Sequence, residues 1–237
     1  MADCARNWTD LMKEKQRENP FLPTHTVIHD ILKDKIISCE LEPGESLKET
    51  DLAEWFGVSR TTIRNALDVL HMEHLVERKG RFLRVTVITR AQYTQLHEYR
   101  RFSDPVAASL AAVRRTKEDL ETLRKYLQEG DSDDPQQFME ADHKFHYAIY
   151  EAAKNQYLLR AYMQIVNDRS RINHFSVSSL SRNSLWEFST GKRNRMREDH
   201  QQILAAIEQG DERLAASLAK KHVGLLIFDF DMYEIKE

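Results

Sequence analysis

The sequence predicts a mainly α protein, with a small N-terminal helical unit that carries a β-hairpin and a larger all-α bundle behind it. Residues that break helices are scarce, because the 237 residues include only 7 glycines and 5 prolines. Apolar residues recur at helical spacing along most of the chain, and only between about 75 and 88 does the pattern change to that of strands. A chain of this length can bury a sizeable core and is expected to hold one large or two modest domains.

Composition also limits the kind of protein. Two cysteines, Cys4 and Cys39, are too few for a disulfide framework or a four-cysteine zinc site, and they fit a reducing compartment. Apolar runs such as 223–228 are too short to span a bilayer. The formal net charge is −3, so a surface that binds nucleic acid must be a local basic patch. We therefore expect a soluble cytoplasmic protein with no membrane segment.

Residues 1–22 are expected to be a polar leader. They mix acidic and basic side chains without an apolar core, which is unlike a signal peptide. Pro20 and Pro23 mark the end of this segment. We expect this polar segment to be mobile or loosely packed.

Residues 23–89 are expected to form the small domain, which begins with two helices. Apolar residues at helical spacing predict a first helix over 24–38, and Pro43-Gly44 predicts a turn after it. A short second helix is predicted to end at Gly57. Its apolar residues are Leu52, Ala53 and Phe56.

A third helix and a hairpin complete this domain. Ser59 is a natural N-cap for the third helix. One face of that helix is predicted to be buried, and it consists of Ile63, Ala66, Leu67 and Leu70. Residues 75–77 and 82–88 then predict a two-stranded hairpin. Helix, short helix, turn, helix and hairpin make a winged helix-turn-helix, in which the second helix of the pair lies in the major groove of DNA.

The opposite face of the third helix has the composition of a DNA-binding surface. It presents Arg60, Thr61, Arg64 and Asn65. Arginine reads guanine through two hydrogen bonds, and threonine and asparagine contact bases or phosphates. No acidic residue occurs over 57–67. The hairpin adds residues suited to phosphate contacts, namely Arg78, Lys79, Arg81 and Arg84. A solvated basic face with no partner is the open alternative.

Residues 91–232 are expected to form the all-helical domain. Nearly every segment is amphipathic, with breaks near 104–105, 116, 130–135, 155, 178–184 and 210–211. These breaks predict about six helices packed as a bundle.

One group of polar residues in this half has the composition of a metal site. Asp142 and His146 are four residues apart, so on a helix both side chains can reach one ion. His200 and His222 lie on later helices. Three imidazoles and a carboxylate suit zinc, nickel, iron or manganese, although core or surface histidines explain the pattern as well. His143 is expected at the surface.

A run of residues through the small domain carries a family resemblance. The run is Leu41-x-Pro43-Gly44-x-x-Leu47, Leu52-Ala53-x-x-Phe56-Gly57-Val58-Ser59-Arg60-x-x-x-Arg64-x-Ala66-Leu67-x-x-Leu70 and Leu75-Val76. It resembles the DNA-binding domain of the GntR family of bacterial regulators. The resemblance implies operator contacts from Arg60 and Arg64 with the hydroxyl residues beside them, and an approach of the wing glycine Gly80 to the minor groove. With the basic and polar residues named above, the predicted DNA-binding residues are Ser59, Arg60, Thr61, Thr62, Arg64, Asn65, Lys79, Gly80 and Arg81. The sequence departs from the family pattern at Thr62, at His74 and in the absence of a second wing glycine.

A second set of residues resembles another part of that family. The set is Tyr99-Arg100-x-x-x-Asp104-Pro105-x-Ala107-Ala108-x-x-Ala111-Ala112, Asp142-x-x-Phe145-His146, Asn155, Asp199-His200 with Ile203 and Ala206, and Gly210-Asp211 with Ala215 and His222. It is similar to the FCD effector domain, which defines the FadR subgroup. The resemblance implies that a divalent metal, with zinc favoured over nickel, manganese or iron, is held by Asp142, His146, His200 and His222.

The resemblance also implies a ligand pocket beside the metal. Arg100 matches an arginine that often lines this pocket, and it can bind a carboxylate through two N–H groups. The alternative is that Arg100 pairs with Asp104 on its own helix face. Further pocket candidates are Arg169, Arg171 and Asn173. We therefore expect a homodimeric repressor whose affinity for operator DNA changes when a small carboxylate binds at the metal.

Other functions stay open at this point. The ion itself could be the signal, or it could only tie the helices of the bundle together. A metallohydrolase would use the ion to activate water, with Glu198 as general base. We expect no enzyme, because the sequence shows no Gly-rich substrate loop and no nucleophile with a partner base.

Overall fold

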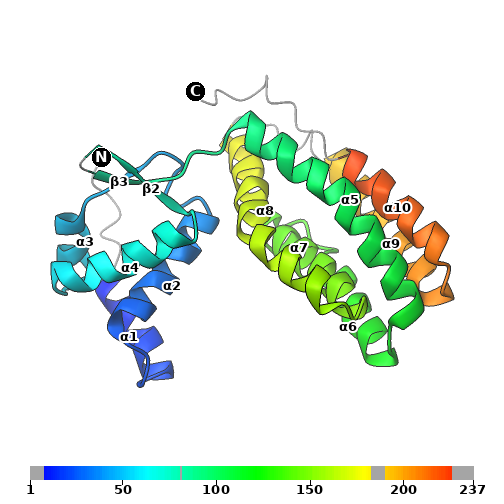
Figure 1. Cartoon of the computed structure of the whole chain (residues 1–237), viewed down its shortest axis with the longest axis horizontal. Coiled ribbons are helices and arrows are strands. Elements are labelled where there is room, and N and C mark those ends of the chain that lie inside the picture. Colours follow the sequence, from blue (N-terminus) through cyan, green and yellow to red (C-terminus); the bar gives the residue numbers. More distant parts are fainter. Residues whose placement is uncertain (1–7, 81, 183–189, 226–237) are drawn as a thin grey trace. The chain divides into compact units, whose positions relative to one another are not determined.

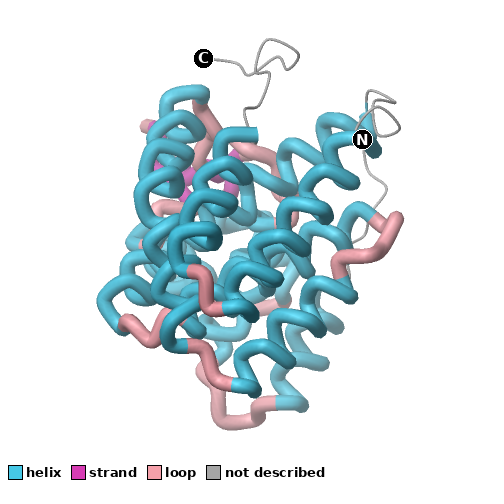
Figure 2. Tube along the Cα trace, turned by 90° about the vertical axis from the view of Figure 1, so that its right-hand side faces the viewer, coloured by secondary structure: helices cyan, strands magenta, loops and turns pink. Residues whose placement is uncertain are grey.

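The structure is a computed structural model, and it describes residues 8–80, 82–182 and 190–225. The chain divides into two compact units, an N-terminal unit of residues 1–88 and a C-terminal unit of residues 89–237. Helices make up most of the described residues, and the short strands all lie in the N-terminal unit (Figures 1 and 2). The predicted fold class, mainly α with a small sheet, is confirmed.

The N-terminal unit combines helices with a small antiparallel sheet. Its helices are α1 (Trp8–Glu18), α2 (Thr24–Ile37), α3 (Glu49–Phe56) and α4 (Arg60–Met72). Its strands are β1 (Ser46–Leu47), β2 (Val76–Lys79) and β3 (Phe82–Val85). β3 lies in the middle and pairs with β2 in the predicted hairpin. On its other side it pairs with β1. Two residues are too few to show the alternation of a strand, so the sequence does not predict β1.

The structure confirms the predicted end of α3, the predicted N-cap of α4 and the predicted buried face of α4. Gly57 ends α3 with a φ of 66°, a left-handed conformation that costs glycine little because it has no Cβ. Ser59 caps α4 by accepting a hydrogen bond from the backbone N–H of Thr62 at 3.2 Å. The four residues of the predicted apolar face of α4, Ile63, Ala66, Leu67 and Leu70, are fully buried. The cap and the buried face together fix which side of α4 faces the solvent.

The expected loose leader is wrong for residues 8–18, which form α1. Trp8 is only 3% exposed, and its ring packs edge-on against Phe56, with ring centroids 5.0 Å apart. The hydroxyl of Thr9 donates a hydrogen bond of 2.7 Å to the carbonyl of Trp55. Met12, four residues after Trp8, is buried as well, and Leu11 packs against the same core, so these three residues form a short apolar stripe at helical spacing. Residues 1–7 of the leader lie outside the described residues.

Truncating Trp8 tests whether α1 belongs to the core. Trp8→Ala is expected to lower the free energy of unfolding of the N-terminal unit by about 3–5 kcal/mol, the usual cost of removing a buried aromatic side chain. Urea unfolding followed by circular dichroism measures the change. Phe21→Ala is the matched control, because Phe21 is 98% exposed. Equal stability of the two variants would show that α1 does not contribute to the core.

The C-terminal unit is a bundle of helices in the described residues. They are α5 (Arg90–Arg114), α6 (Lys117–Glu129), α7 (Pro135–Ala152), α8 (Gln156–Arg182), α9 (Thr190–Gln209) and α10 (Glu212–Leu225). α10 packs along α5 (Figure 1). Small buried residues on α5 let the helices approach closely, namely Ala107, Ala108, Ala111 and Ala112.

The break expected near residues 104–105 is wrong. α5 continues through Pro105, although a proline removes one helical hydrogen bond and costs about 3 kcal/mol. Asp104 and Ala107, on either side of it, are buried in the bundle. Tertiary packing along both halves of the helix therefore outweighs the local cost.

Candidate DNA-binding surface and metal centre

The predicted DNA-reading residues of α4 share its solvent-exposed side. Arg60, Thr61, Arg64 and Asn65 are exposed. Thr62 is half-buried, and its hydroxyl lies 2.8 Å from that of Ser59 in the cap. The side chains of Arg60 and Arg64 are 63% and 55% exposed, so both guanidinium groups can reach an external partner.

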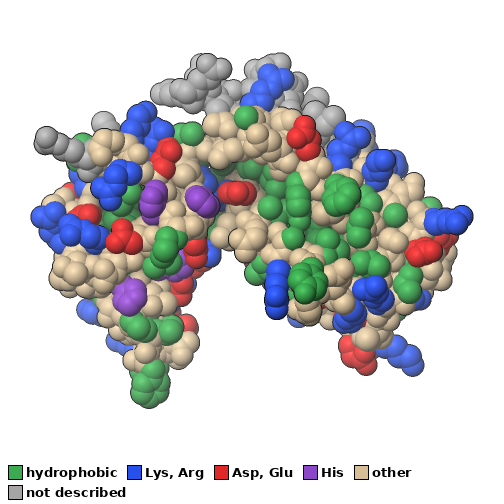
Figure 3. Space-filling view, in the orientation of Figure 1, with side chains coloured by type: hydrophobic (Ala, Val, Ile, Leu, Met, Phe, Trp, Pro, Cys, Tyr) green, Lys and Arg blue, Asp and Glu red, His purple; other side chains and the backbone are tan. Residues whose placement is uncertain are grey.

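The hairpin supplies the second predicted part of this surface. Lys79 and Gly80 are exposed at its tip, and Gly80 has a φ of 62°. Arg84 is less available, because its side chain pairs with Glu77 on the neighbouring strand at 2.6 Å. Basic side chains gather over the part of the N-terminal unit where the hairpin lies (Figure 3). Arg81, another predicted contact, lies outside the described residues.

One acidic residue lies against the basic face of α4. Glu49, the first residue of α3, accepts hydrogen bonds from Nε of Arg64 at 3.1 Å and from Nη2 of Arg64 at 2.8 Å. Nη2 of Arg60 is 3.5 Å from the same carboxylate. The hydrogen bonds from Arg64 lower the pKa of Glu49. Sequence reasoning missed this contact, because Glu49 precedes both arginines by more than ten residues and belongs to another helix.

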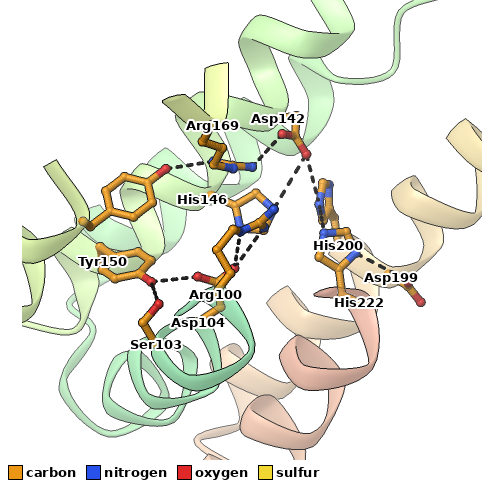
Figure 4. Close-up of polar contacts among 11 residues, drawn as sticks. Arg100, Ser103, Asp104, Asp142, His146, Tyr150, Arg169, Asp199, His200 and His222 are labelled. Carbon is orange, nitrogen blue, oxygen red and sulfur yellow. Dashed lines mark hydrogen bonds and ion pairs between the residues drawn. The ribbon is translucent and has the colours of Figure 1, made fainter. Parts of the chain in front are cut away.

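The four predicted metal ligands form a buried cluster. Asp142 and His146 come from α7, His200 from α9 and His222 from α10 (Figure 4). Each side chain offers one ligand atom, and these atoms all lie within 4.8 Å of one another. All four residues are buried, with exposed fractions between 1% and 5%. The fold thus brings together residues that are 80 positions apart in the chain.

The cluster fits a divalent ion. Oδ1 of Asp142 and Nε2 of His146 are buried, and neither forms a hydrogen bond. Oδ1 of Asp142 is 3.7 Å from Nε2 of His146 and 3.5 Å from Nε2 of His200. Nε2 of His200 is 3.2 Å from Nε2 of His222. Ligand atoms about 2.0–2.1 Å from a tetrahedral zinc are about 3.3 Å apart, close to these three distances of 3.2–3.7 Å.

Two neighbours hold the ligand side chains in place. Arg169 donates a hydrogen bond of 2.7 Å to Oδ2 of Asp142 and another of 2.8 Å to the hydroxyl of Tyr162. Oδ2 of Asp199 is 3.4 Å from Nδ1 of His222, on the side of the ring away from the cluster (Figure 4). A carboxylate on the outer nitrogen of a histidine is the usual support of a metal ligand. The sequence offers one signal for it, an acid directly before His200.

The surroundings set the protonation of the cluster. Burial raises the pKa of Asp142, but the charges of Arg169, His200 and His222 outweigh it and leave the pKa below its usual value. Burial and the charge of Arg169 bring the pKa of His146 well below its usual value. Burial, followed by the charge of His222, lowers the pKa of His200 to about 3. The lowered pKa values of Asp142, His146 and His200 favour an ionised carboxylate and neutral imidazoles at these residues, which is the protonation state that binds metals.

A second polar group lies beside the cluster on α5. Arg100 pairs with Asp104, whose Oδ2 is 3.0 Å from Nε and 2.9 Å from Nη2 of the guanidinium. The hydroxyl of Tyr150 donates a hydrogen bond of 2.7 Å to Oδ1 of Asp104. The structure thus contains the pairing that the sequence offered as an alternative to a pocket role. Arg100 is nevertheless close enough to the cluster to lower the pKa of His146.

The remaining pocket candidates lie on α8. Arg171 is buried and Asn173 is half-buried. Arg171 is two residues after Arg169, about 200° around the helix, whereas Asn173 is four residues after it and shares its side. Of these two residues, Asn173 therefore shares the side of α8 from which Arg169 contacts the cluster, and Arg171 does not.

Sequence reasoning missed two half-buried histidines, each of which has one buried ring nitrogen. His143 was expected at the surface, but its Nδ1 is buried without a hydrogen bond, and burial lowers its pKa to about 4. His97 on α5 has a buried Nδ1 as well, and burial also brings its pKa to about 4. The charge of Arg100 lowers the pKa of His97 further, and the charge of Arg169 lowers that of His143. Neither residue could be distinguished by spacing from an exposed histidine.

Two family models cover most of the chain. The model of the FCD domain matches residues 95–225, which is more than half of the chain. The model of bacterial regulatory proteins of the gntR family matches residues 24–82. The chain belongs to the GntR family. Within this family it carries an FCD domain, so it is a DNA-binding transcriptional regulator of the GntR/FCD type.

The sequences of two curated relatives align with this chain over most of their length. The chain is 30% identical over 208 residues to the HTH-type transcriptional regulator LutR of Bacillus subtilis strain 168, covering 78% of this chain and 90% of LutR. It is 30% identical over 214 residues to the Uxu operon transcriptional regulator of Escherichia coli K12, covering 81% of each protein. Both are named as transcriptional regulators.

Solved structures share the fold. E. coli McbR/YncC superposes with a TM-score of 0.68 at 20% identity, covering 86% of this chain and 95% of that one. A GntR transcriptional regulator from Rhodococcus sp. RHA1 superposes with a TM-score of 0.69 at 23% identity, covering 84% of this chain and 93% of that one. Among the described residues of this GntR protein, no helix has the length and apolar character needed to cross a membrane.

Proposed function

We propose that this GntR protein is a homodimeric repressor whose affinity for operator DNA is set by a small carboxylate bound beside a divalent metal in the C-terminal unit. The observation that carries the proposal is the buried cluster of one carboxylate and three imidazoles, with two unpartnered ligand atoms. Buried ionisable groups of this kind are costly unless they bind something, so they mark functional sites.

The ligand set favours zinc over nickel, manganese and iron, because histidine nitrogens and a single carboxylate oxygen are ordinary zinc ligands. Asp142, His146, His200 and His222 would hold the ion. When bound, the ion supplies a positive centre, and expansion of its coordination from four to five would let a carboxylate oxygen join the four protein ligands. Arg169 and Asp199 keep Asp142 and His222 oriented for it.

The surrounding cations favour an anionic ligand. Arg100 and Arg169 are each 2% exposed, and their partners are Asp104 and Asp142. His97 and His143 offer buried nitrogens that form no hydrogen bond. Asn173 shares the side of Arg169 on α8 and is a further candidate, whereas Arg171 has less support. A small organic acid would meet positive charge and free donors, which is why we infer a carboxylate and not a cation.

The N-terminal unit would read the operator. α4 would enter the major groove with Arg60, Thr61, Arg64 and Asn65 toward the bases. Ser59 and Thr62 lie at its N-terminus, where backbone N–H groups can receive a phosphate. Lys79, Gly80 and Arg81 would follow the neighbouring backbone from the hairpin.

Two copies of the chain would read a near-palindromic operator, one half-site each. A carboxylate that binds one arrangement of the C-terminal units better than another shifts the dimer toward that arrangement. Repression is then relieved when the favoured arrangement no longer matches the operator spacing.

In vitro selection from a random DNA library tests the DNA half of this proposal. The full-length protein is expected to enrich a near-palindrome with half-sites about ten base pairs apart or a multiple of that spacing. Selection at about 0.1 M salt limits non-specific phosphate binding. Failure to enrich any sequence would contradict operator reading by this chain, and enrichment of a single half-site would contradict the dimer.

A further inference from the structure

The contact between Glu49 and Arg64 has a particular geometry. The carboxylate receives Nε–H and one Nη2–H of Arg64, so the two groups meet side-on. An arginine has five N–H donors, and a side-on pair leaves the outer edge formed by Nη1 and Nη2 free. That outer edge is the one that can donate two hydrogen bonds to O6 and N7 of guanine.

Burial and charge distinguish the two partners. The side chain of Glu49 is 25% exposed, whereas that of Arg64 is 55% exposed. Glu49 is thus the less exposed partner, and more than half of the Arg64 side chain stays open to solvent and to an external partner. Because Glu49 begins α3, the helix N-terminus beside it also favours its negative charge.

The same carboxylate affects non-specific binding. A DNA phosphate that approaches Arg64 closely also approaches the negative charge of Glu49, which repels it. A guanine edge carries partial charges only and meets less repulsion. Arg60 is held by the same carboxylate at the longer distance of 3.5 Å, so its hold on Arg60 is weaker.

We propose that Glu49 is a positioning residue for DNA recognition, which holds Arg64 with its outer edge ready for a guanine and disfavours its use as a phosphate contact. The inference rests on the proposed role of Arg64 in reading the operator. It adds a specificity determinant that does not itself touch DNA. Each half-site of the operator is expected to contain a guanine that depends on Glu49.

The test compares Glu49→Gln with the wild-type protein on two DNAs. Fluorescence anisotropy measures the dissociation constants for the operator that the wild type selects and for a scrambled duplex of equal length, at one salt concentration. Glu49→Gln keeps the shape but removes the charge. The preference for the operator is the dissociation constant for the scrambled duplex divided by that for the operator. We expect this ratio to fall by about tenfold or more, as for one weakened arginine–guanine pair. The melting temperature should stay within about 2 °C, because exposed ion pairs contribute little to stability.

Two controls separate positioning from a general effect. Glu54→Gln makes the same substitution at an exposed position of α3 and should leave the ratio unchanged. In an Arg64→Ala background, Glu49→Gln should change the ratio little further, because the two residues act through one contact. An unchanged ratio in Glu49→Gln, or an equal loss of affinity for both DNAs, would overturn the inference. A wild type that does not prefer its selected operator would instead remove the proposed function, and this inference with it.

Discussion

Arg64→Ala is expected to lower the affinity for the selected operator by at least about 30-fold. One arginine–guanine pair contributes about 1–3 kcal/mol, and a dimer loses one such pair in each half-site. The buried face of α4 holds Arg64 on the exposed side of the helix, where its side chain is 55% exposed. Anisotropy titration at fixed salt measures the loss, and Arg60→Ala is expected to weaken binding as well.

Arg17→Ala is the matched control for these variants. Arg17 is an exposed arginine on α1 of the same unit, away from the predicted surface. Removing it changes the net charge by the same amount and should lower the affinity little. If Arg64→Ala bound the operator as well as Arg17→Ala does, α4 would not be the recognition helix.

The second large effect is expected at the metal centre. His222→Ala should remove the bound ion, which the wild type is expected to hold at about one per chain. The ion would tie α7, α9 and α10 together, so its loss should cost the C-terminal unit roughly 3 kcal/mol. That cost corresponds to a fall in melting temperature of about 10 °C. Elemental analysis gives the metal content, and calorimetry gives the melting temperature.

His143→Ala is the control at this site. It removes an imidazole one residue from Asp142 that does not belong to the cluster. This variant should retain the ion and show no metal-dependent change in melting temperature beyond that of the wild type. A wild type that takes up no ion even after metal is added would contradict the proposed site.

Features that depend on local sequence could be predicted. The cap at Ser59, the left-handed Gly57 and the buried face of α4 each follow from residues within one or two turns. The pair of Asp142 and His146 follows from helical spacing in the same way. Joining them to His200 and His222 needed the family resemblance, because spacing along the chain does not determine how distant helices meet.

Features that depend on contacts between distant elements were missed. The burial of Trp8 requires α3 to lie beside α1, and the sequence of α1 does not contain that information. The contacts of Glu49 with Arg64 and of Arg169 with Asp142 join separate helices. Pro105 gave a false boundary, because packing on both sides of it compensates for the lost hydrogen bond.

The central claim is that a small acid bound at the metal controls the affinity of the protein for operator DNA. Displacement of the operator by such an acid tests this claim most directly. Metal-loaded and metal-depleted protein, both bound to labelled operator, are titrated with a panel of small mono-, di- and hydroxycarboxylic acids, and elemental analysis confirms that the loaded protein keeps its ion. The account predicts that at least one acid releases DNA from the loaded protein at a concentration about tenfold lower than from the depleted protein. Release that is equal with and without the ion, or no release by any acid, would contradict it.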